Sequence, residues 1–185
     1  TAGHTVRATD KAFLPGLAVR TEDADLLSVG ACCRLPERAE AVVHLANRPN
    51  AHAGTPQEVL GENVTMNMTV FQTAADLGVK RIVFASSIQV CSGVPAGHTI
   101  EDPWPPPYLP LDGQAPALPG NAYSLSKHLS ETMLAYFART TPLRIAIVRF
   151  PGIVRRWTPD NIMRCSLRDH YYPEAFAVLA RSDAA

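Results

Sequence analysis

Short apolar runs alternate with longer amphipathic segments along this chain. Continuous apolar runs of about five residues are typical of parallel strands that are buried on both faces. The longer segments place apolar residues three or four positions apart, which is the spacing of one helical face. The predicted strands are 5–9, 17–21, 41–46, 81–85 and 144–150, and the predicted helices are 26–40 with a break near Pro36, 56–77, and one that begins at Asn121.

Strands that alternate with helices indicate βαβ units. We therefore predict an α/β fold with a Rossmann-like, doubly wound parallel sheet. A chain of 185 residues is short enough for a single domain, which we place at residues 1–185. Gly78 follows the predicted helix 56–77 and is expected to cap its C-terminus.

Charge and composition narrow the classes of function. Seventeen basic and seventeen acidic residues give a formal net charge of zero, whereas nucleic-acid binding usually needs a basic face. The apolar runs are shorter than the roughly 20 residues of a membrane span, and the first residues do not resemble a signal peptide. The four cysteines lack the spacing of a zinc site. We expect a cytoplasmic protein with reduced thiols and no nucleic-acid, membrane or metal partner.

Tyr123 and Lys127 carry the first candidate chemistry. They lie four residues apart in a segment without Gly or Pro from 122 to 141, so they share a helical face. A nearby ammonium favours the phenolate and is expected to lower the pKa of Tyr123. The tyrosine would then serve as a general acid/base in an alcohol–ketone reaction. By itself the spacing is weak evidence and favours a half-buried tyrosine on an exposed helix face.

A second candidate feature lies upstream of this helix. The apolar run 81–85 is followed by Ser86 and Ser87, and the run 41–46 ends in small residues. Ligands of open α/β sheets bind at the carboxyl ends of strands, where both serines are expected. The sequence therefore predicts that polar groups converge on one edge of the sheet.

Five segments, in this order and spacing, resemble the extended short-chain dehydrogenase/reductases, which are also called the NAD-dependent epimerase/dehydratase family. The matching segments are 42–46, 63–67, 83–87, 123–127 and 148–151, and the resemblance covers roughly residues 3–154. It implies that Tyr123 is the catalytic acid/base and that Lys127 lowers its pKa and holds the nicotinamide ribose. It also implies that Ser87 binds the substrate oxygen, with Ser86 the neighbour most easily confused with it.

The resemblance also implies a set of cofactor-binding residues: Asp10, Asp25, Leu26, Ala46, Asn67, Tyr123, Lys127 and Phe150. Asp10 ends the strand that would be the family's second. Its carboxylate would bind the adenosine ribose and repel a 2′-phosphate, which favours NAD over NADP. Lys11 weakens this preference, and a turn-capping aspartate is the alternative. Asn47, after Ala46, departs from the small residue that relatives usually have there.

The chain differs from the family pattern at both ends. It lacks the glycine-rich phosphate turn and the first strand, and most of the C-terminal substrate region, which indicates an incomplete form of a longer enzyme or a natural remnant. In a 3-2-1-4-5-6 sheet the first strand lies between the second and the fourth. We therefore expect strands 5–9 and 41–46 to run parallel without bonding each other, about two strand spacings or roughly 9 to 10 Å apart.

The resemblance implies an NAD-dependent epimerase/dehydratase or oxidoreductase that acts on a nucleotide sugar or a related hydroxyl or carbonyl compound. The alternative is a non-catalytic nucleotide-sensing or scaffold protein that retains the fold. Intact Ser87, Tyr123 and Lys127 favour the enzyme. The expected partners are a small-molecule substrate and, as one option, a second copy of the chain. The proline-rich segment 94–120 fits either a linker or a loop that contacts substrate, and His44 and His128 are assigned no catalytic role.

Overall fold

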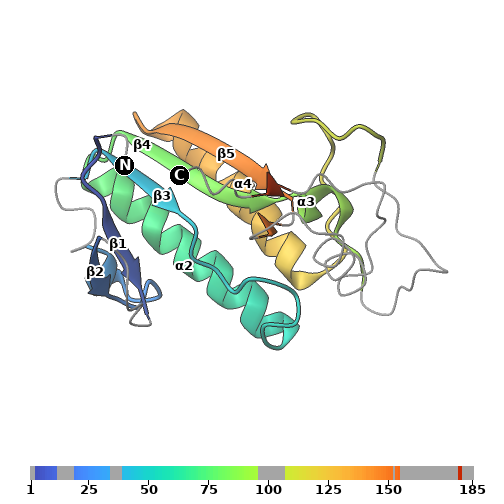
Figure 1. The fold of residues 1–185 in the computed structure, drawn as a ribbon, viewed down its shortest axis with the longest axis horizontal. Coiled ribbons are helices and arrows are strands. Elements are labelled where there is room, and N and C mark those ends of the chain that lie inside the picture. The colour runs from blue at the N-terminus through green and yellow to red at the C-terminus, as the bar shows by residue number, and fades with distance from the viewer. Residues whose placement is uncertain are drawn as a thin grey trace.

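The computed structural model describes residues 3–11, 19–33, 39–95, 107–151, 153–154 and 179–180. Strands and helices alternate along most of this part of the chain (Figure 1). The elements are β1 Arg7–Asp10, β2 Arg20–Asp23, α1 Val29–Cys32, β3 Ala41–His44, α2 Pro56–Asp76, β4 Arg81–Ser87, α3 Gln89–Ser92, α4 Ala122–Thr140, β5 Arg144–Phe150, β6 Ile153–Val154 and β7 Leu179–Ala180.

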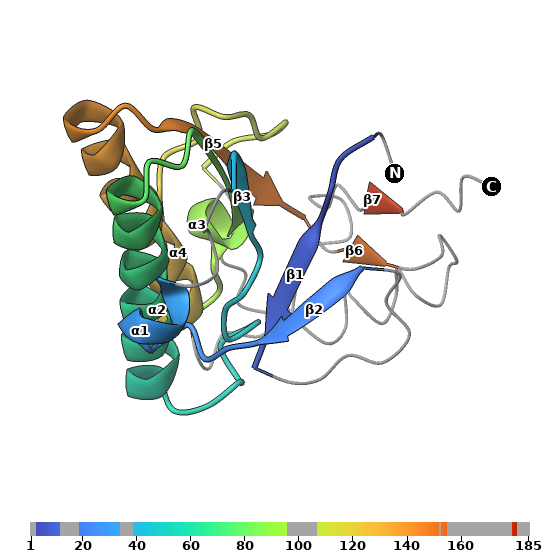
Figure 2. The same cartoon turned by 90° about the vertical axis from the view of Figure 1, so that its left-hand side faces the viewer.

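Within the described residues, the strands form three separate parallel sheets. β3, β4 and β5 form the central sheet, β1 pairs with β2, and β6 pairs with β7. The parallel α/β architecture is confirmed. Figure 2 shows β1 and β2 apart from β3, as expected if one strand position lies between them. The prediction that β1 and β3 do not bond each other is confirmed, whereas their expected spacing stays a prediction.

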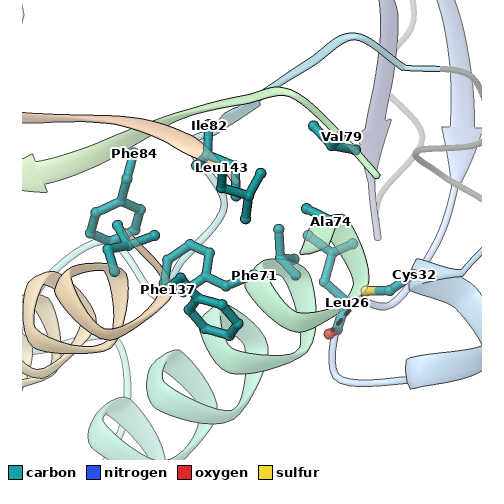
Figure 3. Packing of buried hydrophobic residues seen from close by; sticks show 11 residues of the cluster. Leu26, Cys32, Phe71, Ala74, Val79, Ile82, Phe84, Phe137 and Leu143 are labelled. Carbon is teal, nitrogen blue, oxygen red and sulfur yellow. Dashed lines mark hydrogen bonds between the residues drawn. The ribbon is translucent and has the colours of Figure 1, made fainter. Parts of the chain in front are cut away.

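Helices α2 and α4 pack side by side on one face of the central sheet (Figure 2). The hydrophobic core between these two helices and the central sheet contains the phenylalanines Phe71, Phe84 and Phe137, and Figure 3 shows how they pack. The ring centroids of Phe71 and Phe84 lie 5.5 Å apart, and those of Phe71 and Phe137 lie 6.2 Å apart, both edge to face. Each such fully buried side chain contributes roughly 1.5 to 3 kcal/mol relative to exposure.

Local signals at the helix ends explain why α2 and α4 begin and end where they do. Thr55 and Glu58 form a reciprocal capping box at the start of α2, and Asn121 and Ser124 form another at the start of α4. Each box satisfies orphan N–H groups of the first turn. Gly78 has a positive φ of 70° just past α2, which confirms the predicted C-terminal cap.

Some predicted boundaries were wrong. β2 lies at Arg20–Asp23 instead of 17–21, since its polar residues pair in register with β1 and tertiary pairing overrides intrinsic preference. Residues 12–18 and 34–38 lie outside the described ranges. The helix predicted at 26–40 is short, because a turn at Leu26 and Leu27 delays its start to the N-cap Ser28.

The strand predicted at 81–85 is also longer in the structure. β4 continues through Ser87 because its last two residues pair with Arg149 and Phe150 of β5. In the described part of the chain, no helix is long and apolar enough to cross a membrane.

Candidate active site

Tyr123 and Lys127 lie on the first two turns of α4 and face the sheet. Both are buried, with 9% and 3% of their surface exposed. The Lys127 Nζ atom lies 5.7 Å from the centre of the Tyr123 ring and 4.8 Å from that of Phe84. It donates a hydrogen bond of 2.7 Å to the carbonyl oxygen of Ala85 on β4. The two residues thus share a helical face, as their spacing predicts.

Ser87 is the third residue of this group. It ends β4, and its Oγ atom accepts a hydrogen bond of 3.2 Å from the backbone N–H of Gln89. Its side chain also lies near enough to the Tyr123 phenol to lower the pKa of that group. The three side chains therefore meet at the carboxyl end of β4, where ligands of parallel sheets bind.

The adjacent Ser86 has a different environment. Its Oγ atom donates a hydrogen bond of 2.6 Å to Oε1 of Glu131 on α4. Glu131 lies two helical turns beyond Tyr123 on α4, so the two adjacent serines face different parts of the same helix. Ser87 is the serine that contacts the tyrosine.

Burial sets the protonation of the site. Burial raises the pKa of Tyr123 above its ordinary value, and the Ser87 side chain lowers it by less. The expected lowering of the Tyr123 pKa by Lys127 is therefore wrong for this structure, because desolvation of the phenolate dominates. Burial also lowers the pKa of Lys127 to about 8.

A buried polar network lies beneath this group. Asn67 accepts a hydrogen bond of 2.7 Å from Nε2 of His44 and donates one of 2.6 Å to Ser130. Burial lowers the pKa of His44 to about 4, so the imidazole is neutral at pH 7. Asn67 also exchanges longer hydrogen bonds with Asn47. It is fully buried, so contact with a cofactor would require one of these partners to move.

Sequence reasoning missed the role of Asn63, one turn before Asn67. Its Oδ1 atom accepts a hydrogen bond of 2.7 Å from the backbone N–H of Arg48, and its Nδ2 atom donates one of 3.0 Å to Ser126. Ser126 in turn donates to the carbonyl oxygen of Tyr123 at 2.7 Å. The signal was present in the sequence as two asparagines at helical spacing.

The ion pair between Glu131 and Arg149 was also missed. The Arg149 Nε atom lies 3.0 Å from Oε1 of Glu131, and its second nitrogen lies 2.8 Å from Oε2. Glu131 lies one helical turn beyond Lys127, and Arg149 interrupts an otherwise apolar strand. These positions in the sequence indicate that both polar side chains lie near the same edge of the sheet.

The family model that matches this chain is described as the NAD dependent epimerase/dehydratase family, and it matches residues 1–161. The chain belongs to this family. The match includes the segments that carry Ser87, Tyr123 and Lys127.

Curated relatives of this epimerase/dehydratase-family chain are sugar dehydrogenases by name. It is 28% identical over 142 residues to an NAD-dependent glucose-6-phosphate dehydrogenase of Haloferax volcanii, covering 76% of this chain and 54% of the relative. It is 32% identical over 117 residues to a uronate dehydrogenase of Pseudomonas putida, covering 61% and 37%. The chain thus spans about half or less of the length of these relatives.

A solved structure from Agrobacterium tumefaciens, a short-chain dehydrogenase/reductase superfamily protein with bound NAD, is also similar. It has a TM-score of 0.71 at 25% identity, with 83% of this chain and 43% of the other covered. A UDP-glucose 4-epimerase from Brucella ovis in complex with NAD has a TM-score of 0.69 at 20% identity, over 82% and 46%. The second likeness shows the fold alone.

The remaining predicted cofactor residues of this family member lie in different environments. Asp10 ends β1, and Phe150 ends β5 opposite Ser87. Asp25 accepts a hydrogen bond of 3.0 Å from the Leu27 N–H, which is a turn-capping role. Leu26 belongs to the apolar core, and Ala46 packs against it. Their contacts with a cofactor stay predictions.

The donor set at the carboxyl end of β4 fits a ribose of such a cofactor. The Lys127 ammonium has three N–H donors, and among the described residues its acceptor is the Ala85 carbonyl oxygen. Two donors therefore remain for ribose hydroxyls. In the described part of the chain, no group of His, Cys, Asp and Glu could hold a metal ion.

Proposed function

We propose that this chain is the catalytic core of an NAD-dependent oxidoreductase that acts on a hydroxyl or carbonyl group of a sugar, a sugar acid or a nucleotide sugar. The observation that carries the proposal is the placement of Ser87 at the carboxyl end of β4 beside Tyr123 and Lys127, which share one face of α4 and are joined to β4 through the Ala85 carbonyl oxygen. A module that only binds nucleotide would not need all three side chains. The names of the curated relatives favour the sugar or sugar-acid dehydrogenase.

Tyr123 would exchange the proton in this reaction. In the reductive direction its phenol donates a proton to the carbonyl oxygen of the substrate, while Ser87 donates a hydrogen bond to the same oxygen. The raised pKa of Tyr123 keeps the phenol protonated and suits this direction. In the oxidative direction the phenolate must form, and a cation brought next to the phenol would favour it.

NAD, when bound, supplies the hydride chemistry. Lys127 would hold its nicotinamide ribose, and Asp10 and Phe150 would contact it from the ends of β1 and β5. Asp25, Leu26, Ala46 and Asn67 complete the proposed set of cofactor-binding residues. A carboxylate at position 10 favours NAD over NADP, since it repels a 2′-phosphate. A homodimer and a cytoplasmic location stay predictions.

The test is a substrate panel with the complete enzyme. Glucuronate, galacturonate, glucose 6-phosphate and UDP-glucose are each supplied with NAD or NADP, and the formation of NADH or NADPH and the sugar configuration are measured. A dehydrogenase accumulates NADH with one substrate, whereas an epimerase converts UDP-glucose to UDP-galactose without net NADH. Neither NADH nor an altered sugar, in a preparation that binds NAD, would contradict the proposal and favour the nucleotide-sensing alternative.

A further inference from the structure

One arginine joins four elements beside the proposed site. The Arg149 guanidinium pairs with Glu131 of α4 through two nitrogens, and its third nitrogen donates to the carbonyl oxygen of Ala115 at 2.8 Å. The same nitrogen lies 3.2 Å from Sγ of Cys91 on α3. Arg149 itself belongs to β5. A single side chain therefore fastens residues 107–120, here called the cover segment, to the carboxyl end of the sheet.

The cover segment lies beyond the carboxyl ends of β4 and β5, next to α3 (Figure 1). Its base is closed by backbone contacts, because the Leu118 N–H donates to the Val90 carbonyl oxygen at 2.8 Å. A Cβ atom on Gly120 would clash with the carbonyl oxygen of Gly93, so the C-terminal end of the cover segment approaches Gly93 too closely for a side chain. Nearer the middle of the cover segment, the Ala115 carbonyl oxygen accepts hydrogen bonds from both the Arg149 guanidinium and the Cys91 thiol.

The ion pair also bears on Ser87. Oε1 of Glu131 accepts hydrogen bonds from both Arg149 and Ser86, the residue before Ser87. On the other side of Ser87, the Ile88 N–H donates to the Phe150 carbonyl oxygen at 3.0 Å. The backbone on both sides of Ser87 is therefore tied to β5 and α4.

We propose that Arg149 and Glu131 are positioning residues, which hold the cover segment as a wall of the substrate site and set the Ser87 hydroxyl beside Tyr123. The side chains are 23% and 11% exposed, and removing one partner of such a pair leaves the other charge uncompensated. The catalytic consequence rests on the proposed function. The fastening of the cover segment does not, since it can be measured without activity.

The chain offers a matched control pair. Arg48 forms the same two-nitrogen pair with Glu62 of α2, at 2.8 and 2.7 Å, and its third nitrogen donates to the carbonyl oxygen of Ala53. Its side chains are 26% and 30% exposed. The pair thus repeats the chemistry of the proposed positioning pair but fastens the loop after β3.

The experiment compares Arg149→Met with Arg48→Met in the complete enzyme. Alkylation of Cys91 by iodoacetamide, followed by mass spectrometry of its peptide, reports release of the cover segment, because Cys91 is only 2% exposed. We expect Arg149→Met to raise the alkylation rate about tenfold or more and Arg48→Met to leave it unchanged. Equal rates in the two variants would overturn the proposal.

Kinetics test the catalytic consequence with the substrate found in the panel. We expect Arg149→Met to lower kcat about tenfold or more with little change in KM for NAD, and Arg149→Lys to recover part of the loss. An unchanged kcat in a variant whose cover segment is released would overturn the effect on Ser87.

If Arg149→Met fails to fold, the same alkylation and kinetic measurements on Arg149→Lys test the proposal, because lysine keeps the charge but loses the two-nitrogen geometry. Wild-type alkylation and kcat in Arg149→Lys would then overturn the proposal.

If the panel finds no substrate, the proposed function fails while the alkylation comparison still reports on the fastening of the cover segment. If the cover segment is released in Arg149→Met but the wild type is inactive on the substrate panel, only the proposed function is contradicted. If Cys91 stays unreactive in Arg149→Met while the wild type is active on the panel, only the positioning role is contradicted.

Discussion

The interface between α2 and α4 has a polar half and an apolar half. Toward the N-terminal ends of both helices, Asn63 bonds Ser126 and Asn67 bonds Ser130, all of them fully buried. Toward the C-terminal ends, the contacts are made by apolar side chains. These are Phe71, Leu134 and Phe137, each with 1% or less of its surface exposed.

The two halves contribute differently to the molecule. Apolar contacts stabilise in proportion to buried area and tolerate small shifts between helices. Amide–hydroxyl bonds are directional, and a one-turn slip would break both of them. The polar half is the half that carries Tyr123 and Lys127. The comparison indicates that the polar half, next to the proposed site, specifies the position of α4 relative to α2, while the apolar half supplies most of the stability.

The largest expected effect is in the apolar half. Phe71→Ala removes a fully buried ring that contacts both Phe84 and Phe137. We expect it to lower the free energy of unfolding by about 3 to 5 kcal/mol, as measured by urea denaturation. In the protein that remains folded, kcat should be unchanged. A loss below about 1 kcal/mol would show that this half is not the main source of stability.

The pH dependence of stability tests the buried imidazole beneath the polar half. The pKa of His44 is about 4 in the folded chain and about 6.5 when unfolded. The unfolded state then binds the extra proton first, so stability falls as the pH drops from 6.5 to 4, by roughly 3 kcal/mol. His44→Gln should flatten this fall in thermal melts at several pH values. An unchanged slope would mean that His44 is not held neutral.

A smaller effect is expected from one hydroxyl of the polar half. Ser130→Ala leaves an amide hydrogen of the buried Asn67 without its acceptor, which should cost about 1 to 3 kcal/mol of unfolding free energy. Thr132→Ala is the control, since the Thr132 hydroxyl bonds the His128 carbonyl oxygen on the exposed side of the same helix. The control should change stability by less than about 0.5 kcal/mol. Equal losses in the two variants would remove the distinction between buried and exposed hydroxyls.

The smallest effect lies outside the interface. Asp10→Asn should leave both halves of the interface intact and erode the preference of the complete enzyme for NAD over NADP, by about tenfold or less. Binding titrations with both cofactors measure the ratio. An unchanged ratio would favour the alternative that Asp10 caps a turn.

The sequence predicted the elements whose signals are local. α2 and α4 have capping residues at their first turn and uninterrupted helical periodicity, so both limits of α2 and the start of α4 were predicted almost to the residue. Ser87, Tyr123 and Lys127 could be predicted as site residues because their spacing and order along the chain carry a family pattern. The pKa of Tyr123 was not predicted, because it depends on how much water the fold removes from the phenol.

The parts that were missed depend on contacts between distant segments. The Asn63–Ser126 bond joins residues 63 positions apart, and Arg149 meets Ala115 across 34 positions. The sequence marks Asn63 and Arg149 as polar residues, but no local pattern identifies the distant residue that each one bonds. β2 was misplaced for the same reason, since its polar residues form a strand only through pairing with β1.

The most direct test of the account is Tyr123→Phe in the complete enzyme, measured for both NAD affinity and turnover. The substitution removes only the phenolic oxygen that would exchange the proton. Tyr136→Phe, at an exposed tyrosine of the same helix, is the control. The account predicts that Tyr123→Phe keeps NAD binding and lowers kcat by about 10²- to 10⁴-fold, while the control is unaffected. Turnover within a fewfold of wild type in a Tyr123→Phe protein that binds NAD would contradict it.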